Sequence, residues 1–294
     1  MGLFFSSDRF TRPGPGVRPD APRKKGVARL AEIMGRDMWN FFRAGFLAFL
    51  GCLPFIIGMF FAVETHALLF MLLAGIIGGL IAGPELSAMA DTVLRSLRDE
   101  PGYWWETYRR VWKRNARESL VPGMLTGLVL SMQIFTLFHM SVISAGIVTW
   151  VLLILSFLVT LGLESYIWPQ IALLDLPLYG ILKNSLLLFL GYLPRSLGAI
   201  AIKAVYWGAI LLFFPLTTII LPFTNFWLPM LPALLCIYQP LNKCFTIEST
   251  INKMREDDLN AALAKDNEPL PEDPTEKAEE STEASSDDSS PDVQ

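Results

Sequence analysis

Histidine and carboxylate side chains are the groups best suited to bind a metal ion or to transfer a proton. The sequence has only two histidines, His66 and His139, and each lies in a short turn between two long apolar runs. If the two turns met, they would form a His/His/carboxylate metal site with Glu64 on the outer face of a membrane. Two candidate ligands on separate turns are weak evidence, so we predict neither a metal nor another cofactor.

Other catalytic patterns are absent from the sequence. It contains no GxSxG, HExxH, P-loop or GxGxxG motif. Its three cysteines, Cys52, Cys236 and Cys244, lie in or beside apolar runs without CxxC or Cys/His spacing, which is typical of buried free thiols. An enzyme is therefore the least favoured of the functions considered, and we predict no catalytic residue.

A few strongly polar residues lie in the apolar runs or at their ends. Ionisable and polar side chains inside a membrane often mark the pathway of a transported substrate. The candidates are Gln133, Glu164, Lys203 and Asn225. Most of them lie near the ends of the runs, and Gln133 is better suited to a hydrogen bond between helices. A small-molecule transporter or permease component therefore stays an alternative function.

The richest set of binding side chains lies between residues 103 and 119. Aromatic residues recur there at helical spacing, and basic residues occupy the opposite side. The candidate interfacial or partner-binding residues are Trp104, Trp105, Tyr108, Arg109, Trp112, Lys113, Arg114, Asn115 and Arg117. Such a helix suits the level of the lipid headgroups, where it can bind anionic headgroups of the lipid bilayer or an acidic partner protein. We expect no nucleic-acid partner.

Membrane-spanning helices must position these residues. The chain is 52% hydrophobic and 18% charged, against about 25% charged for a soluble domain, and whole windows lack charge. The apolar runs predict an all-α polytopic membrane protein with about six transmembrane helices, at residues 44–63, 67–82, 121–138, 142–163, 204–221 and 226–241. Cytoplasmic amphipathic interfacial helices are predicted at residues 85–98, 103–119 and 177–190.

Small residues predict where two of these helices touch. Gly75, Gly79 and Gly83 recur every four residues along the second span, and Pro84 is expected to end that span. A row of glycines on one helix face lets the backbone of another helix approach closely. We therefore expect the tightest helix contact of the protein along this row.

The distribution of charge predicts the orientation. Alternate segments between the apolar runs contain all 24 Lys and Arg residues, so the positive-inside rule places both termini in the cytoplasm. We divide the chain into a basic N-terminal segment (1–37), a membrane domain (38–254) and an acidic C-terminal tail (255–294). The tail lacks aromatic residues and is expected to be disordered.

Several short motifs occur in an order that resembles the YesL-like family of bacterial integral membrane proteins, which is built around a domain of unknown function. The motifs are MGLFF, Arg36-Asp37-Met38-Trp39-Asn40, Leu53-Pro54 with Gly58, Gly83-Pro84 with Leu86 and Ala88, Gly102-Tyr103, and Tyr108-Arg109-Arg110-Val111-Trp112-Lys113-Arg114-Asn115. The resemblance covers residues 1–250 approximately. The chain departs from it at Glu85, where a small residue is usual, and in its longer N-terminal extension.

The resemblance implies an accessory role beside carbohydrate-uptake systems, without assigning any chemistry. Together with the aromatic and basic helix, it favours an accessory or assembly factor of the cytoplasmic membrane, with a membrane transport complex as a partner. The oligomeric state and any substrate stay open.

Overall fold

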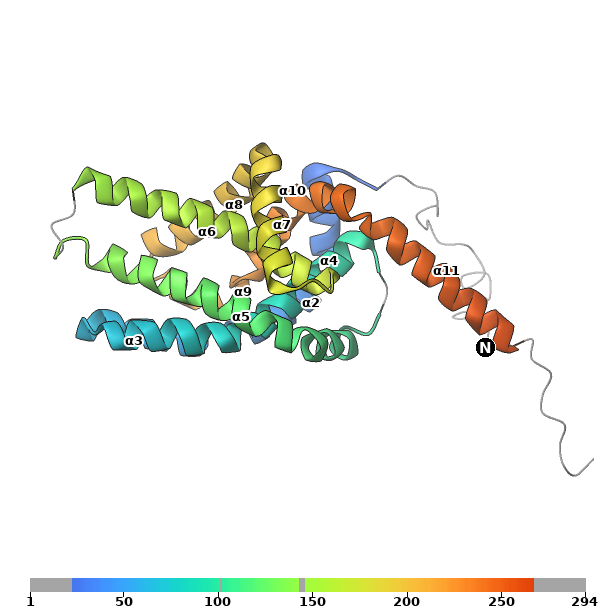
Figure 1. Ribbon diagram of the computed structural model, residues 1–294, viewed down its shortest axis with the longest axis horizontal. Helices are drawn as coiled ribbons and strands as arrows, with labels where there is room; N and C mark the ends of the chain where they lie inside the picture. The colour runs from blue at the N-terminus through green and yellow to red at the C-terminus, as the bar shows by residue number, and fades with distance from the viewer. Residues whose placement is uncertain (1–22, 101, 143–145, 267–294) are drawn as a thin grey trace, which may run out of the picture. The chain divides into compact units, whose positions relative to one another are not determined.

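The computed structural model describes residues 23–100, 102–142 and 146–266 of the chain. These residues are almost entirely helical, and no strand occurs among them (Figure 1). The chain forms two compact units, Met1–Phe245 and Thr246–Gln294, which are described separately. The first unit contains α2 (Gly26–Thr65), α3 (Leu68–Leu73), the π-helical turn η1 (Ala74–Gly78), α4 (Gly79–Arg98), α5 (Trp104–Phe138), α6 (Ile147–Leu173), α7 (Leu178–Gly191), α8 (Leu193–Leu212), α9 (Thr217–Thr224) and α10 (Trp227–Phe245).

Five helical segments of the described chain are long and apolar enough to cross a membrane, namely α2, the run from α3 to α4, α5, α6 and α8. An all-α polytopic architecture is therefore confirmed. Large apolar side chains such as Phe60, Val151 and Leu212 are exposed on these helices, as expected for groups that contact lipid. The predicted sixth span, 226–241, corresponds to α10, which is not among the five.

The predicted end of the second span at Pro84 is wrong. From Leu68 to Arg98 the chain is one helical run that contains η1, and the predicted interfacial helix 85–98 is the C-terminal part of this run. That part is not at a surface, because most residues of α4 are buried and α2, α5, α6 and α10 contact it. Its polar side chains tolerate burial because neighbouring helices provide hydrogen-bond partners, which helical periodicity alone does not reveal.

Two further boundaries differ from the prediction. The interfacial helix 103–119 and the third span 121–138 form a single helix, α5, with Pro122 inside it. The fourth span, predicted at 142–163, is α6, which contains Pro169 and continues to Leu173. A proline removes one backbone hydrogen bond, and membrane helices tolerate this loss where neighbouring groups compensate it. The helix predicted at 177–190 corresponds to α7.

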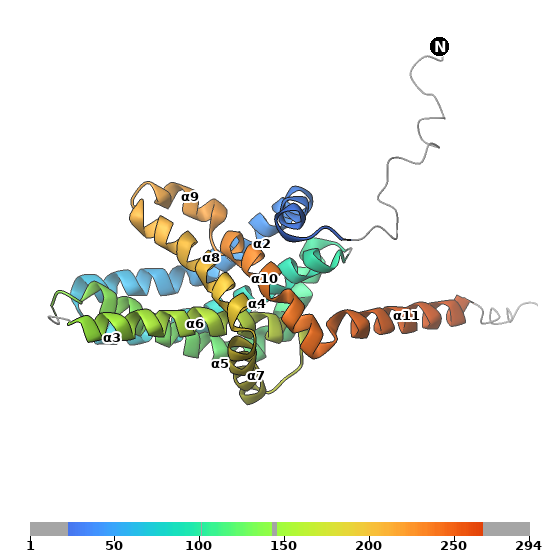
Figure 2. The same cartoon turned by 90° about the horizontal axis from the view of Figure 1, so that it is seen from above.

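The predicted fifth span, 204–221, is divided in the structure. α8 ends at Leu212, residues 213–216 reverse the chain, and α9 runs back beside α8 (Figure 2). The hydroxyl groups of Tyr206 and Thr224 lie 2.9 Å apart and join the two helices. Pro215 lies in the reversal, where its ring and missing N–H oppose continuation of α8.

The glycine row of the second span lies against α5. A Cβ atom placed on Gly75 would lie 2.8 Å from the Cα atom of Leu128, and one placed on Gly127 would lie 2.8 Å from the Cα atom of Gly79. Such distances leave no room for a side chain, so the two backbones are in direct contact. The facing row on α5 has the same four-residue spacing and consists of Ser119, Gly123, Gly127 and Ser131.

The second unit contains α11, which runs from Ile247 to Asp266. The prediction that the chain is disordered from residue 255 is therefore wrong for residues 255–266. This stretch contains several strong helix formers, as in its Ala-Ala-Leu-Ala-Lys sequence, and a charged helix can form without a packed core. Residues 267–294, which make up the rest of the predicted acidic tail, lie outside the described residues.

Candidate functional site

Three arginines from the N-terminal part of the chain hold the C-terminal end of α4. The last carbonyl groups of a helix lack backbone donors. Guanidinium groups supply them here, since Arg23 donates to the carbonyl of Arg98 (3.1 Å), Arg29 to that of Leu97 (3.1 Å) and Arg36 to that of Ser96 (2.8 Å). Positive charge at this end also complements the helix dipole. These basic residues therefore connect the start of the chain to α4, in addition to contributing the positive charge that the positive-inside rule counts.

Asp99 follows α4 and contacts the same three arginines. Its carboxylate accepts a hydrogen bond from Arg29 at 2.6 Å and forms ion pairs with Arg36 and Arg23. Its φ of 58° is a left-handed conformation that Asp adopts more readily than most residues. Partial burial alone would raise the pKa of the Asp99 carboxyl, but hydrogen bonds from Arg36 and Arg29 outweigh it and lower the pKa below its usual value.

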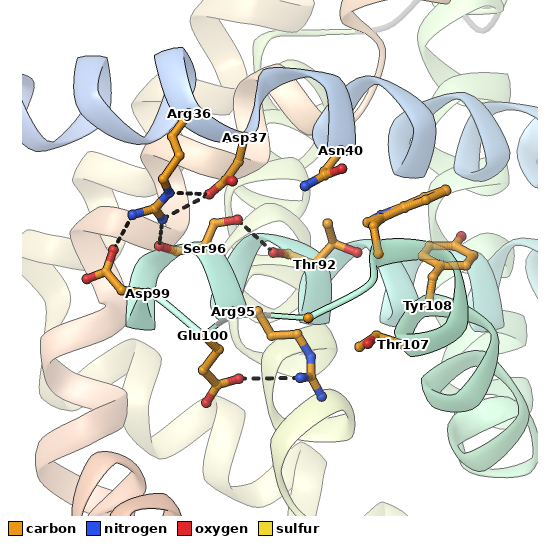
Figure 3. Close-up of a pocket in the computed structure, with 12 residues that line it drawn as sticks. Arg36, Asp37, Asn40, Thr92, Arg95, Ser96, Asp99, Glu100, Thr107 and Tyr108 are labelled. Carbon is orange, nitrogen blue, oxygen red and sulfur yellow. Dashed lines mark hydrogen bonds and ion pairs between the residues drawn. The ribbon is translucent and has the colours of Figure 1, made fainter. Parts of the chain in front are cut away.

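A polar cleft of about 330 Å³ lies beside this cluster (Figure 3). Figure 3 shows Asn40 of α2 above Thr92 of α4, and Arg95 directed toward Glu100. The cleft is lined by residues of α2, α4, the following turn and the first turns of α5, namely Arg36, Asp37, Asn40, Thr92, Arg95, Ser96, Asp99, Glu100, Gly102, Trp104, Thr107 and Tyr108. It therefore joins the Arg36–Asn40 motif to the aromatic and basic stretch.

Charged groups of the cleft are paired with one another. Arg95 contacts Asp91 at 2.6 Å and Glu100 at 3.5 Å, and Glu100 also accepts two hydrogen bonds from Arg98. A carboxylate that guanidinium groups engage is stabilised as the anion and is a poor general base. The described residues that line the cleft therefore provide groups for binding, but not the activated nucleophile and base of a catalytic site.

Part of the predicted partner-binding set faces inward and fastens α5 to α4. The Tyr108 hydroxyl donates to the carboxylate of Glu85 at 2.5 Å. The Asn115 amide donates to the Ser87 hydroxyl at 3.1 Å. Both Tyr108 and Asn115 are buried, so these bonds hold one face of α5 in place.

These contacts require the first turns of α5 to change direction. Gly83 packs against Ser119, so a straight antiparallel helix would place Tyr108 beside the C-terminal end of α4. Tyr108 instead reaches Glu85, which lies only two residues after Gly83. The first turns of α5 therefore run across α4 rather than along it.

Five other residues of the set lie on the exposed side of α5, which we call the α5 strip: Trp105, Arg109, Trp112, Lys113 and Arg117. The side chains of the two tryptophans are 57% and 36% exposed, respectively. In the part of the chain that the structure describes, none of the three basic side chains has an ion-pair partner. The strip thus combines unpaired positive charge with accessible aromatic surface.

The four aromatic residues of the predicted set do not all face the bundle. Trp104 lines the cleft, whereas the neighbouring Trp105 points outward. On an ideal helix these four aromatic residues lie within an arc of about 100°, and the contacts of α5 with the rest of the bundle take up only the side of this arc that holds Trp104 and Tyr108. Arg114 is exposed, but it donates to the carbonyl of Ala172 at 2.8 Å and so contacts the end of α6.

The structure brings the two histidines of the chain together. His139 donates from Nδ1 to the carbonyl of Phe135 at 2.7 Å, so its Nε2 atom accepts a hydrogen bond from Nδ1 of His66, also at 2.7 Å. Among the described residues, no three or more His, Cys, Asp and Glu side chains lie close enough to hold a metal ion. The described residues therefore lend no support to the alternative metal site with Glu64, and the histidine pair links two turns.

Two of the polar residues considered for transport have structural partners. Gln133 donates to Thr160 at 2.8 Å and to Ser156, which joins α5 to α6. Asn225 is buried between α9 and α10, where its amide donates to the carbonyl of Pro222 at 3.0 Å and its oxygen accepts from the first N–H groups of α10. It thus satisfies backbone groups that the break between these helices leaves unbonded.

Glu164 of α6 and Lys203 of α8 are the other two polar residues. They line the same small cavity together with residues of α10. Opposite charges on neighbouring helices offset part of the cost of burying each other. Gln133 and Asn225 are explained by their structural hydrogen bonds, whereas Glu164 and Lys203 are not.

Sequence reasoning missed Glu85 and the second row of small residues. Glu85 is an acidic residue in a largely apolar stretch, and the structure shows that its carboxylate accepts a hydrogen bond from Tyr108. The row on α5 has the same four-residue spacing as the glycine row and could have been recognised in the sequence. The arginine contacts of Asp99 gave no comparable signal, because they join segments far apart in the chain.

Comparison of the chain with protein-family models, with curated proteins and with solved structures gives no match. The resemblance to the YesL-like family therefore stays a prediction. A function has to be inferred from the geometry around α4 and α5.

Proposed function

We propose that this protein is a membrane-embedded docking factor that binds another membrane complex through the α5 strip. The observation that carries the proposal is the contrast between the two faces of α5. One face is fastened to α4 through Tyr108 and Asn115, whereas the other presents exposed tryptophan and unpaired basic side chains. A helix face that is already rigid loses little conformational entropy on binding.

The orientation forms part of the proposal. We infer that both termini lie in the cytoplasm, because the segments with Lys and Arg alternate with segments that have none. The end of the bundle that carries the α5 strip then lies at the cytoplasmic face of the cytoplasmic membrane. The strip is accessible there to the cytoplasmic parts of other membrane proteins.

The chemistry of the strip indicates an acidic partner surface. Arg109, Lys113 and Arg117 attract carboxylates, and Arg and Trp are enriched among the residues that dominate binding energy at protein interfaces. The resemblance to the YesL-like family supports a solute-uptake complex, specifically one for carbohydrates, as the partner class. The protein would then act as an accessory or assembly factor of that complex.

Charge reversal tests the docking surface. The variant R109E/K113E/R117E should insert normally but lose its partner, because like charges would then face each other across the interface. We expect recovery of the partner after cross-linking in native membranes and affinity purification to fall at least about tenfold. Mass spectrometry of the recovered material identifies the partner and shows whether it belongs to an uptake complex.

A matched control has the same change in charge at other exposed positions. The variant K183E/K253E/R255E replaces three basic residues outside the strip and should recover the partner as the wild-type chain does. Equal recovery by the two triple variants would contradict docking through the strip. Recovery of lipid without any membrane complex by the wild-type chain would also contradict it, since the strip would then serve only as an anchor.

A further inference from the structure

The composition of α2 indicates that Arg43 lies at one boundary of the hydrocarbon core. It precedes the uncharged residues 44–63 of α2, and 20 helical residues span about 30 Å, the thickness of that core. Trp39 and Asn40 lie one helical turn before it and therefore fall within the headgroup layer, which adds about 5–7 Å on each side. Their level is that of lipid phosphates rather than of bulk water.

The guanidinium group of Arg43 lies beside two aromatic rings and has no anionic partner among the described residues. Its Cζ atom lies 5.0 Å from the ring centre of Trp39 and 5.6 Å from that of Trp104. Arg29 and Arg36, the other arginines of α2, both pair with Asp99. Arg43 is exposed and forms no ion pair within the part of the chain that the structure describes. Its five N–H donors are therefore unused.

Two further donors near Arg43 lack acceptors. Asn40 lies three residues earlier on the same helical face, lines the cleft and has no side-chain hydrogen bond to a described residue. The indole N–H of Trp104 is buried without an acceptor among the described residues. Two carboxylates that line the cleft, Asp37 and Asp99, already engage Arg36. The described residues therefore leave room for an additional acceptor that they do not provide themselves.

We propose that this corner between α2 and α5 binds the phosphate group of an anionic phospholipid. A phosphate offers oxygen acceptors that match the guanidinium fork of Arg43 in a bidentate arrangement. Asn40 can donate to the same group, while the rings of Trp39 and Trp104 hold the guanidinium plane and contact the glycerol region. The site is separate from the α5 strip and does not depend on the docking function.

Lipid-dependent stability of the full chain provides the test. Thermal unfolding is measured in nanodiscs of phosphatidylcholine to which phosphatidylglycerol is added stepwise. The phosphate of phosphatidylglycerol, unlike that of phosphatidylcholine, is not paired with a choline cation in its own headgroup, so phosphatidylglycerol should stabilise the wild-type chain. R43Q should shift the concentration required at least about tenfold, the effect of losing a charge-assisted hydrogen-bonded pair. R43Q also loses the contacts with the rings of Trp39 and Trp104, so its response to phosphatidylglycerol is measured relative to its own unfolding temperature in pure phosphatidylcholine.

Two other variants separate a built site from general attraction. R43K keeps the charge but loses the bidentate geometry. The phosphatidylglycerol concentration needed to stabilise R43K should therefore rise nearly as much as for R43Q. R110Q removes an exposed arginine of α5 outside the corner and should respond to phosphatidylglycerol as the wild-type chain does. An equal effect of R43Q and R110Q, or a wild-type response of R43K, would overturn the proposal. Equal protection by inorganic phosphate in pure phosphatidylcholine would overturn the assignment to a lipid.

Discussion

Asp99 shows how a single side chain can join the start of the chain to the end of a central helix. It contacts Arg23, Arg29 and Arg36, and each of these also donates to a terminal carbonyl of α4. A carboxylate at a helix C-terminus is disfavoured by the helix dipole. The arginines reverse this effect, because their charge lies between the carboxylate and the carbonyl groups.

We expect D99N to destabilise the full chain by roughly 1–2 kcal/mol at pH 7, since it removes the charge that engages three guanidinium groups. Asn tolerates the left-handed conformation at this position, so the variant changes charge without adding backbone strain. Thermal unfolding in detergent or nanodiscs measures the loss. A D99N chain as stable as the wild-type chain at pH 7 would show that the ion pairs contribute nothing.

The stability difference between the wild-type and D99N chains should depend on pH, and the direction of this dependence follows from the pKa of Asp99. The pKa of Asp99 is lower in the folded chain than the usual value of 3.8, so its ion pairs contribute fully at pH values well above 3.8. This contribution is lost as the pH falls through the folded pKa. The stability difference between wild-type and D99N chains should therefore shrink between pH 7 and pH 3. A difference that is constant or increases over this range would contradict the lowered pKa.

The sequence predicted which residues have side chains suited to binding. It predicted only in part which of these side chains face the bundle and which face outward. Residues 103–119 were recognised by aromatic and basic composition, yet Trp104 and Tyr108 face inward and Trp105 faces outward. Helical periodicity defines the angles between the side chains of one helix, but it does not show which face of that helix contacts a neighbouring helix. The polar side of a helix is usually assumed to be exposed. This assumption fails for α5, because a polar partner such as Glu85 of α4 lets a polar side chain face inward.

Among the helices, the contact of α4 with α5 is the one most sensitive to added volume. The glycine row meets a facing row of small residues, and the two backbones leave no room for a Cβ atom at Gly79. Packing of this kind replaces the hydrophobic effect, which does not drive helices together inside lipid. The first turns of α5, and with them the α5 strip, depend on this contact.

We expect G79A to destabilise the chain by about 1–3 kcal/mol, because the new methyl group would overlap the backbone carbonyl of Gly123. The control is G35A, in α2, where a Cβ atom would meet nothing within 4 Å. Ala is a better helix former than Gly, so G35A should be neutral or stabilise by up to about 1 kcal/mol. Thermal unfolding of both variants measures the difference. Similar effects of the two substitutions would show that helix propensity, and not the contact, determines the result.

The existence of most helices was predictable from hydropathy, but their ends were not. Pro84, Pro122 and Pro169 were each natural places to expect a boundary, and all three lie inside helices. A proline prevents one backbone hydrogen bond, and its cost is small compared with the gain from continuing a packed helix through a membrane. The interruption between α9 and α10 occurs instead at Asn225, whose side chain replaces the missing backbone partners.

Within the first unit, α9 and α10 together return the chain along α8. Neither is among the helices long and apolar enough to cross a membrane alone. The hydroxyl of Tyr192 nevertheless lies 3.6 Å from the thiol of Cys244, which places the end of α10 beside the start of α8. If α8 crosses the membrane, the broken segment must cross it in the opposite direction. The predicted sixth span is then this pair of helices rather than residues 226–241 alone.

The sidedness of Cys244 tests this arrangement of the whole molecule. Its thiol is exposed, whereas Cys52 is buried, so Cys244 is a native reporter in a C52S/C236S chain. With the proposed orientation, a membrane-impermeant maleimide should label Cys244 in inverted membrane vesicles but not in intact cells, and C244S should abolish the signal. Labelling in intact cells would place the end of α10 outside. Given the contact with Tyr192, it would place the start of α8 there as well, and the cytoplasmic position of the α5 strip would lose its support.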